Sequence, residues 1–365
     1  GIAGGKTGLG ANTIMAHGMA EEMGVPFAVR DVEGTEPALH PLAAAGSRRE
    51  LKRNIALHHV NADRIPLQIM SPELARRNDT YHIGFLLWEL DRIPQAHRLG
   101  LSLLDEIWAP SRFVADLYAA QTSKPVHLVK KGLVDLQGLQ RLSADQNSDP
   151  GRFTTMICFD FHSSVERKNP LAAVRAFQIA FPRHSHADCR LIVKTTPTTR
   201  GHWGDPADQF GQIRNLAAKD KRIEIVEDFV SQPELWRMMK SATCILSTHR
   251  AEGFGYIPAY ALALAKPLVT TDYGGPRDFC TPRTSFPVAA TLVHVPNGHA
   301  LYSPEGAKWA DVSPEAVALS LRRVYDNPEM AAARARRGQA LLTRDYSMTA
   351  YAARCRRRLE QIGAL

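Results

Sequence analysis

The sequence has few cysteines, and their arrangement disfavours a structural metal site. Five cysteines are spread over 365 residues, with no CxxC pair and no cluster of histidines and cysteines at the spacing of a zinc site. The motifs of three hydrolase classes are also missing, because there is no GxSxG nucleophile elbow, no catalytic-cysteine signature and no HExxH helix. We therefore expect a protein of a reducing compartment that holds no structural metal and does not hydrolyse substrates by these routes.

Long hydrophobic runs are absent as well. The longest apolar stretches that are nearly free of charge, 81–88 and 256–265, fall well short of the ~18 residues that a bilayer-spanning helix needs. The first residues resemble neither a signal peptide nor a transit peptide, although residue 1 is glycine rather than an initiator methionine. The expected location is the cytoplasm.

The composition that is present is that of an ordinary globular protein. Hydrophobic residues make up 44%, charged residues 22% and aromatic residues 7%, which excludes a disordered, collagen-like or coiled-coil chain. At ~150 residues per domain, the length predicts about two domains.

The net charge of +8 is concentrated near the end of the chain. Residues 321–365 contain ten arginines, no lysine and four acidic residues, a net of +6. A solvated helix face and a contact with an anionic membrane surface both explain this pattern. Nucleic acid is the least favoured partner, because no aromatic residues are interleaved with the basic ones in a recognised binding motif.

Short apolar runs alternate with helical patterns, which is typical of βαβ units around a parallel sheet. The polar segment 142–151 (LSADQNSDPG) interrupts this pattern and is the best linker candidate. We expect an α/β protein with two doubly wound domains, 1–145 and 146–345, followed by a helix over 346–365. The expected strands are 26–29, 55–60, 81–85, 106–109 and 126–129 in the first domain, and 153–159, 190–194, 222–226, 244–247, 268–271 and 292–295 in the second.

Residues 4–10 form the first of three loops with candidate chemistry. This glycine-rich segment precedes a helical run over 12–23, and the backbone N–H groups of such a turn can approach a phosphate. Two nucleotide-binding motifs are incomplete, since the first glycine of a Walker A loop would precede residue 1 and Thr13 replaces the third glycine of the dinucleotide fingerprint. An ordinary tight turn and a phosphate cradle both fit this segment.

Two more polar loops follow predicted strands in the second domain, where ligands of open α/β sheets bind. Residues 159–170 (FDFHSSVERKNP) hold basic side chains that can neutralise a phosphate, although capping of a helix start explains the same residues. Residues 247–256 (STHRAEGFGY) hold one carboxylate beside two glycines. His82 and His162, each at the end of a predicted strand, are further candidate site residues.

In their order and spacing, these segments resemble the retaining glycosyltransferases of family 4 over nearly the whole chain. The resemblance is strongest in FDFHSSVERKNP and HRAEGFGYIPAYALALAKPLVTTDYGGPRDF, and YHIGFLLWELDRIP and DEIWAPSRFVADLY add weaker marks. It implies the GT-B architecture, in which two Rossmann-like domains face each other across a cleft and the last helix crosses back to the first domain.

The resemblance also implies the residues of the site. Glu252 and the backbone of the three residues after it would hold the donor sugar, and Lys168 with Arg167 would neutralise the donor diphosphate. Together with His82, Glu252 and Lys168 are the expected catalytic residues, and His82 and Glu89 are expected on the acceptor side. The donor-binding residues implied in this way are Gly8, Gly10, Arg167, Lys168, Glu252, Gly253, Phe254, Gly255 and Tyr260.

One position departs from the family pattern. The family usually carries a second glutamate eight residues after the first, where it contacts the nucleotide ribose, and here that position is Tyr260. A phenol can hydrogen-bond a ribose hydroxyl, but it lacks the charge that strengthens such a bond. Two alternatives therefore stay open beside an active transferase: a non-catalytic nucleotide- or glycan-binding relative, and a nucleotide-sugar epimerase on a similar fold.

The activity implied by the resemblance is transfer of a hexose from a nucleotide-diphosphate sugar to a hydroxyl of a glycan or lipid-linked acceptor, with retention of configuration. No metal or other cofactor is expected, because fixed cations and N–H donors can stabilise the leaving diphosphate. A role in surface polysaccharide biosynthesis and a peripheral contact of the arginine-rich end with an anionic membrane, at its inner face, are further expectations.

Overall fold

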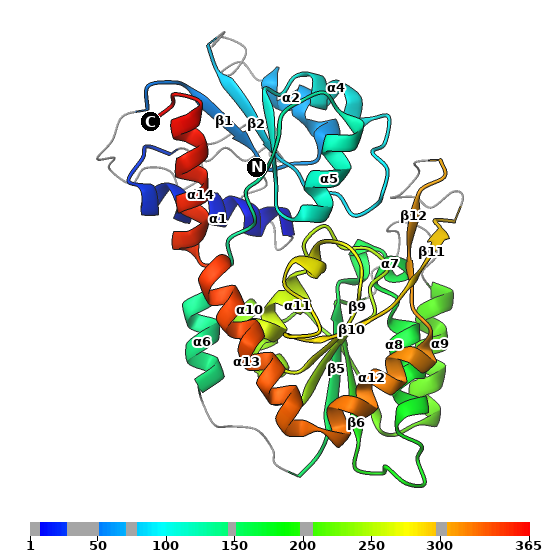
Figure 1. The fold of residues 1–365 in the computed structure, drawn as a ribbon. Coiled ribbons are helices and arrows are strands. Elements are labelled where there is room, and N and C mark those ends of the chain that lie inside the picture. The colour runs from blue at the N-terminus through cyan, green and yellow to red at the C-terminus, as the bar shows by residue number, and fades with distance from the viewer. Residues whose placement is uncertain (1–7, 28–50, 71–78, 145–150, 198–206, 297–304) are drawn as a thin grey trace. The chain divides into compact units, whose positions relative to one another are not determined.

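The computed structural model describes residues 8–27, 51–70, 79–144, 151–197, 207–296 and 305–365. The chain divides into two compact units, Gly1–Asp135 with Arg344–Leu365 and Leu136–Thr343 (Figure 1). The sequence placed the boundary ten residues later, after residue 145. Helix α6 (Leu136–Ala144) belongs to the second unit because it packs there, and Ser143 Oγ donates a hydrogen bond to the Leu264 carbonyl at 3.1 Å.

The described residues of the first unit form a four-stranded parallel sheet in the order β1-β2-β3-β4. The strands are β1 (Ile55–His58), β2 (Tyr81–Phe85), β3 (Glu106–Ala109) and β4 (Val126–Leu128). The helices are α1 (Gly8–Met23), η1 (Ala62–Arg64), α2 (Ile65–Ile69), α4 (His97–Ser102), α5 (Arg112–Gln121) and α14 (Met348–Gln361). The four strands match the expected ones to within two residues, but residues 26–27 are not in a strand, and the rest of the expected strand 26–29 lies outside the described residues.

Helices α1 and α14 pack together on the first sheet, although 324 residues separate the end of one from the start of the other. The apolar stripe of α14 explains this, because Tyr351, Cys355 and Leu359 recur at four-residue spacing and all three are buried. They share a core with Met15 and Met19 of α1. The last helix is therefore part of the first unit.

The second unit is built on a six-stranded parallel sheet in the order β10-β9-β8-β5-β6-β7. The strands are β5 (Thr154–Phe159), β6 (Arg190–Thr195), β7 (Ile223–Glu227), β8 (Cys244–Ser247), β9 (Leu268–Thr271) and β10 (Phe286–Val288). In chain order the sheet starts at its centre with β5, runs outward through β6 and β7, and then returns to the other side of β5 with β8. The point where the order reverses lies between β5 and β8, and such a reversal creates a crevice at the carboxyl ends of the strands.

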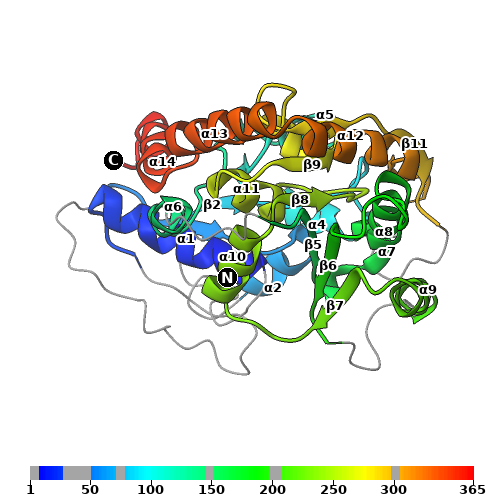
Figure 2. The same ribbon diagram turned by 90° about the horizontal axis from the view of Figure 1, so that it is seen from below.

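Helices cover both faces of this second sheet (Figure 2). The helices are η2 (Phe161–Ser163), α7 (Val165–Lys168), α8 (Pro170–Ala180), α9 (Ala207–Lys219), α10 (Gln232–Ser241), α11 (Tyr256–Ala263), η3 (Gly275–Asp278), α12 (Pro314–Asp326) and α13 (Pro328–Asp345), the last of which ends in the first unit. Helix α8 packs against α9 and α12, whereas α10 and α11 lie on the other face with α6. Helix α8 buries Val174 and Phe177, three residues apart on one face, in the larger core.

Two details of the second unit differ from the sequence prediction. The segment 292–295 was expected to join the parallel sheet, but it forms β11 (Thr291–His294), which pairs antiparallel with β12 (Lys308–Asp311) in a separate two-stranded sheet. The sixth strand of the parallel sheet is instead β10, which contains Pro287. Proline is tolerated there because β10 is an edge strand and one side of its backbone needs no ladder hydrogen bond.

The arginine-rich end of the chain is largely engaged in internal contacts. Arg358 contacts the buried Glu106 with both its Nε and Nη2 atoms, and Arg354 Nε donates to the Val129 carbonyl. Six of the ten arginines in residues 321–365 donate hydrogen bonds within their own unit: Arg322, Arg334, Arg337, Arg344, Arg354 and Arg358. Within the described ranges, no helix has the length and apolar character needed to cross a bilayer.

Candidate active site

The candidate site lies in the second unit, where β5 and β8 end beside each other. A small pocket opens at this edge, in the crevice that the reversal of strand order creates. Its lining combines apolar residues of the strands with polar residues of the loops. The pocket is lined by Ile157, Cys158, Phe159, Lys168, Pro170, Leu246, Ser247, Thr248, His249, Glu252 and Ile257.

The cations of the site come from α7, a single turn that follows β5. The Ser164 side chain caps this turn by accepting a hydrogen bond from the Arg167 N–H at 3.2 Å. Ser164 and Asn169, with φ of 68° and 52°, flank the turn in left-handed conformations. This sharp entry and exit place two consecutive basic residues, Arg167 and Lys168, at the carboxyl edge of the sheet.

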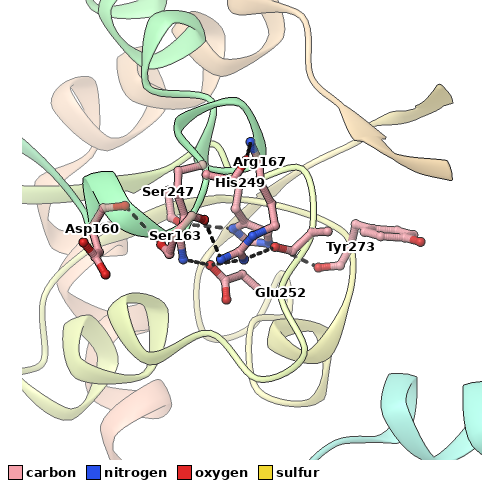
Figure 3. A network of polar contacts seen from close by, with 10 residues as sticks. Asp160, Ser163, Arg167, Ser247, His249, Glu252 and Tyr273 are labelled. Atoms are coloured by element: carbon pink, nitrogen blue, oxygen red, sulfur yellow. Dashed lines mark hydrogen bonds and ion pairs between the residues drawn. The ribbon is translucent and has the colours of Figure 1, made fainter. Parts of the chain in front are cut away.

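Both cations contact one carboxylate, Glu252, which follows β8. Figure 3 shows Arg167 beside Glu252. Lys168 Nζ donates a hydrogen bond to Glu252 Oε1, and Arg167 Nη1 lies 3.4 Å from the same oxygen. Burial opposes ionisation of Glu252, but the charges of Lys168 and Arg167 outweigh it and lower the carboxyl pKa to about 2. The Glu252 side chain is 16% exposed and that of Lys168 is 19% exposed, so a ligand in the pocket can reach both groups.

A second loop supports the backbone of Glu252. Gly275 N–H donates to the Glu252 carbonyl at 2.8 Å. A Cβ atom on Gly274 would lie 2.5 Å from the Glu252 carbonyl oxygen, and one on Gly275 would lie 2.1 Å from the Gly253 carbonyl oxygen. These approaches exclude any side chain, so the two glycines of the 273–278 turn let one loop pack directly under the other.

The buried His249 side chain connects the same two loops by hydrogen bonds. Its ring is buried, with Nδ1 3.0 Å from Ser247 Oγ and Nε2 3.2 Å from the Tyr273 carbonyl oxygen (Figure 3). Because a carbonyl only accepts, Nε2 carries the proton, and Nδ1 accepts from the Ser247 hydroxyl. Burial lowers the pKa of His249 to about 4, so the ring is neutral at pH 7.

Arg250 joins the Glu252 loop to α7 and to β12. Its backbone N–H donates to the Arg167 carbonyl at 2.7 Å. Its guanidinium contacts Asp311 at 3.0 Å and the Glu166 carbonyl at 3.2 Å, and it lies over the Trp309 ring at 5.4 Å. The turn that carries the cations and the loop that carries the carboxylate are therefore tied together through their backbones.

Tyr260 lies one helical turn into α11, which begins directly after the loop Glu252–Gly255. The phenol accepts a hydrogen bond from Gln232 Nε2 at 2.8 Å and packs edge-to-face against Trp236, both on α10. Burial raises the pKa of Tyr260 above its ordinary value, so the phenol stays protonated. The hydroxyl at the position of the expected ribose contact is therefore already engaged with another side chain.

The other predicted donor-binding residues belong to both units. Gly253, Phe254 and Gly255 lead from Glu252 into α11, and Gly255, at φ 90°, is its N-cap. Gly8 and Gly10 lie in the first turn of α1, which begins four residues earlier than predicted, and residues 4–7 lie outside the described residues.

His82 and Glu89, the predicted acceptor-side residues, lie toward opposite ends of β2. His82 is the second residue of β2, at its amino end, and its ring stacks on His58 with centroids 5.3 Å apart. Glu89 follows the carboxyl end of β2. Ligands of parallel sheets bind at the carboxyl ends, so the position of His82 does not support the role expected for it. The side chain of His162 lies outside the description.

Sequence reasoning assigned no role to His249, Arg250 or Asp311, although all three organise the site. The signal available was weak, since a histidine and an arginine in a polar loop are ordinary surface residues on sequence grounds. Only the fold shows that β12 brings Asp311 to within 3.0 Å of Arg250. Among the described residues, no three His, Cys, Asp or Glu side chains gather as a metal-binding group.

Comparison with known proteins agrees with this geometry. Residues 166–301 match the family model described as glycosyl transferases group 1, and this segment contains Arg167, Lys168 and Glu252. No curated protein matches the chain significantly. The second unit therefore carries a glycosyl transferases group 1 domain.

Solved structures similar to this chain share its fold at low sequence identity. Anabaena Alr3699/HepE in complex with UDP is 13% identical with a TM-score of 0.61, covering 84% of this chain and 79% of that one. A mutant of S. aureus TarM in complex with fondaparinux, alpha-GlcNAc-glycerol and UDP is 10% identical with a TM-score of 0.57, covering 82% of this chain. Sucrose-phosphate synthase from Thermosynechococcus elongatus is 15% identical with a TM-score of 0.58, covering 80% of this chain and 70% of that one.

This chain spans about half of the TarM chain, 54%. The likeness to these structures confirms the predicted fold class, an α/β protein of the GT-B type with two Rossmann-like units.

Proposed function

We propose that the protein is a retaining glycosyltransferase that moves a hexose from a nucleotide-diphosphate sugar to a hydroxyl of a glycan or lipid-linked acceptor. The observation that carries this proposal is the meeting of Lys168 and Arg167 with Glu252 at the carboxyl edge of β5 and β8. A diphosphate needs cations, and a sugar needs acceptors for its hydroxyl groups. The pocket offers both within one hydrogen-bonded cluster.

The chemistry of this site is electrostatic. Breaking the bond between the sugar and the diphosphate develops negative charge on the leaving phosphate, and fixed cations stabilise that charge without reorganising. Lys168 is the cation placed to do so, and Glu252 accepts hydrogen bonds from the sugar and fixes its orientation. We assign removal of the acceptor proton to the donor phosphate itself. Catalysis of this kind needs no metal.

The comparisons suggest the donor to test first. The Alr3699/HepE and TarM structures both contain UDP, and one Alr3699/HepE structure contains UDP-glucose. UDP sugars are therefore the leading donors, surface polysaccharide synthesis is the proposed role, and the cytoplasm is the proposed location. If the protein touches an anionic membrane through its arginine-rich end, the arginines to test are those without an internal hydrogen bond among the contacts above: Arg323, Arg336, Arg356 and Arg357.

A non-catalytic nucleotide- or glycan-binding role is the second candidate, favoured by one observation. The Tyr260 phenol is held by Gln232 and carries no charge, so it is a poorer partner for a ribose than a carboxylate. An inactive binder would keep the diphosphate cations and lose turnover. Turnover of the donor separates the two candidates.

The test has two steps. First, thermal unfolding is followed with UDP, GDP, ADP and dTDP, without metal, for the wild type, Lys168→Ala and Lys219→Ala, an exposed lysine of α9 that serves as the matched control. A ligand at a hundred times its dissociation constant adds about 2.7 kcal/mol, and we expect that gain for one nucleotide in the wild type and the control but not in Lys168→Ala. Stabilisation by no nucleotide, whether bare or as its hexose ester, contradicts the proposal.

Second, the matching UDP- or other nucleotide-diphosphate hexose is incubated with glycan acceptors, and products are resolved by mass spectrometry and NMR. A glycosylated acceptor with the anomeric configuration of the donor is the expected product. Conversion of the donor sugar without any acceptor identifies an epimerase instead, and binding without turnover identifies the inactive relative.

A further inference from the structure

The cation that a diphosphate would use is paired with a carboxylate when no ligand is bound. Lys168 Nζ donates to Glu252 Oε1, and Arg167 Nη1 approaches the same oxygen at 3.4 Å. Arg167 is otherwise committed to the backbone, with Nη1 2.8 Å from the Ala251 carbonyl and Nη2 3.1 Å from the Ser163 carbonyl. Within the described part of the chain, the Lys168 ammonium group pairs with Glu252 and not with a set of backbone carbonyls, so it is the cation whose partner can change.

Glu252 stays charged under all ordinary conditions. The surrounding cations hold its carboxyl pKa near 2, so it carries a full negative charge at neutral pH. A phosphate that reaches Lys168 therefore comes close to an ionised carboxylate in a pocket that is largely screened from water. Like charges at such a distance repel, and the repulsion is stronger where water is excluded.

The sugar of a complete donor changes this balance. Its hydroxyl groups donate hydrogen bonds, and an ionised carboxylate is a strong acceptor for them. Glu252 can then exchange Lys168 for hydroxyl donors while Lys168 turns to the diphosphate. A bare nucleoside diphosphate brings the negative charge without the compensating donors.

We propose that Glu252 is a specificity-determining residue that competes with the ligand's diphosphate for Lys168, so that the site accepts a sugar-bearing diphosphate and disfavours a bare one. The inference rests on the proposed function and deepens it. It also gives the ion pair a part in turnover: once the sugar has left, Glu252 returns to Lys168 and weakens the hold on the nucleoside diphosphate product. The pair thereby speeds product release.

The decisive measurement is the affinity of a bare diphosphate for a variant that lacks the competing charge. Binding of UDP and UDP-glucose is measured by titration calorimetry for the wild type and Glu252→Gln, with GDP, ADP and dTDP and their glucose esters as further probes. Glu227→Gln is the matched control, because Glu227 is a carboxylate of the same unit that pairs with Arg214 at the end of β7. Thermal unfolding checks that each variant is folded.

We expect Glu252→Gln to bind the bare diphosphate about tenfold more tightly than the wild type does, as removal of a like charge predicts. The same variant should bind the sugar ester more weakly, while Glu227→Gln changes neither affinity. Glu252→Ala removes the carboxylate without putting an amide in its place, and it must also raise the affinity for UDP. This variant replaces Glu252→Gln in the experiment if Glu252→Gln is unstable. If Glu252 only held the loop in place, its substitution would weaken the binding of UDP and of UDP-glucose alike.

Lys168→Met supplies the second half of a double-mutant cycle. In the Lys168→Met background, Glu252→Gln should no longer improve binding of the bare diphosphate, because the contested cation is gone. A gain that persists there refutes competition for Lys168. If the wild type binds a nucleoside diphosphate and Glu252→Gln binds it equally or less well, this inference fails and the proposed function stands. If neither protein binds any of the nucleotides, both fail.

Discussion

Two buried histidines predict that the protein loses stability as the pH falls below 6.5. His58 in the first unit and His249 in the second each have a pKa lowered by burial from 6.5 to about 4. As the pH falls, the unfolded chain therefore takes up protons before the folded chain does. The stabilisation given by the neutral rings is complete above pH ~6.5 and is lost progressively toward pH ~4.

The size of the effect follows from the two pKa values. At pH 5 the linkage relation gives a loss of about 2 kcal/mol for each histidine, from a maximum of roughly 3.4 kcal/mol. The carboxylates Glu252 and Asp220, both with a pKa of about 2, stabilise the fold until the pH falls below the range in which the histidines gain protons. They therefore do not mask the loss of stability caused by the histidines. The other histidines with lowered pKa add in the same direction: His59, His82, His97 and His127.

The assay compares thermal unfolding at pH 7.5, 6 and 5 for the wild type and His249→Gln. Glutamine keeps a donor that can reach the Tyr273 carbonyl but has no proton to gain. We expect the variant to be less stable at pH 7.5 and the gap to narrow by about 2 kcal/mol at pH 5, which is several degrees in the midpoint of a unit of this size. If both proteins lose stability in parallel between pH 7.5 and 5, the reasoning is wrong.

Two further predictions concern the framework of each unit. Gly275→Ala places a methyl group 2.1 Å from the Gly253 carbonyl oxygen, and urea unfolding should show a loss of roughly 3 kcal/mol, whereas Gly211→Ala, with open space around it, should be neutral or slightly stabilising. Glu106→Gln leaves the Arg358 guanidinium without its buried counter-charge, and the first unit should lose about 3 kcal/mol in the same assay. A loss below about 1 kcal/mol in either case contradicts the contact invoked.

The strands of both sheets were largely predictable because central parallel strands form short continuous apolar runs. The errors lie where that signal is ambiguous. The run at 292–295 is as apolar as a buried strand, yet β11 is exposed along its whole length and pairs with β12. Strand β10 was missed because Pro287 interrupts it, and only its place at the sheet edge makes that proline acceptable.

The loops of the candidate site could be predicted from the sequence, but the contacts between them could not. The basic pair and the carboxylate stand in loops that follow strands, and the sequence alone identifies both loops as candidates. Nothing in the sequence brings Lys168 to Glu252, 84 residues away, because that contact depends on β5 and β8 being neighbours. The strand that contains His82 was predicted correctly, and the structure places His82 at the amino end of that strand, so its role on the acceptor side stays a prediction.

The loops of the site hold their shape through backbone contacts, and this determines what a ligand can change. Arg250 N–H donates to the Arg167 carbonyl at 2.7 Å, and Gly275 N–H donates to the Glu252 carbonyl at 2.8 Å, so both loops are fixed without using the side chains of Lys168 or Glu252. The Lys168 and Glu252 side chains are the parts left to exchange partners. A ligand at this site therefore meets loops that are already held in place, and the ion pair is the contact that it must rearrange, which is why a single Glu252→Gln substitution is a sharp test of the site.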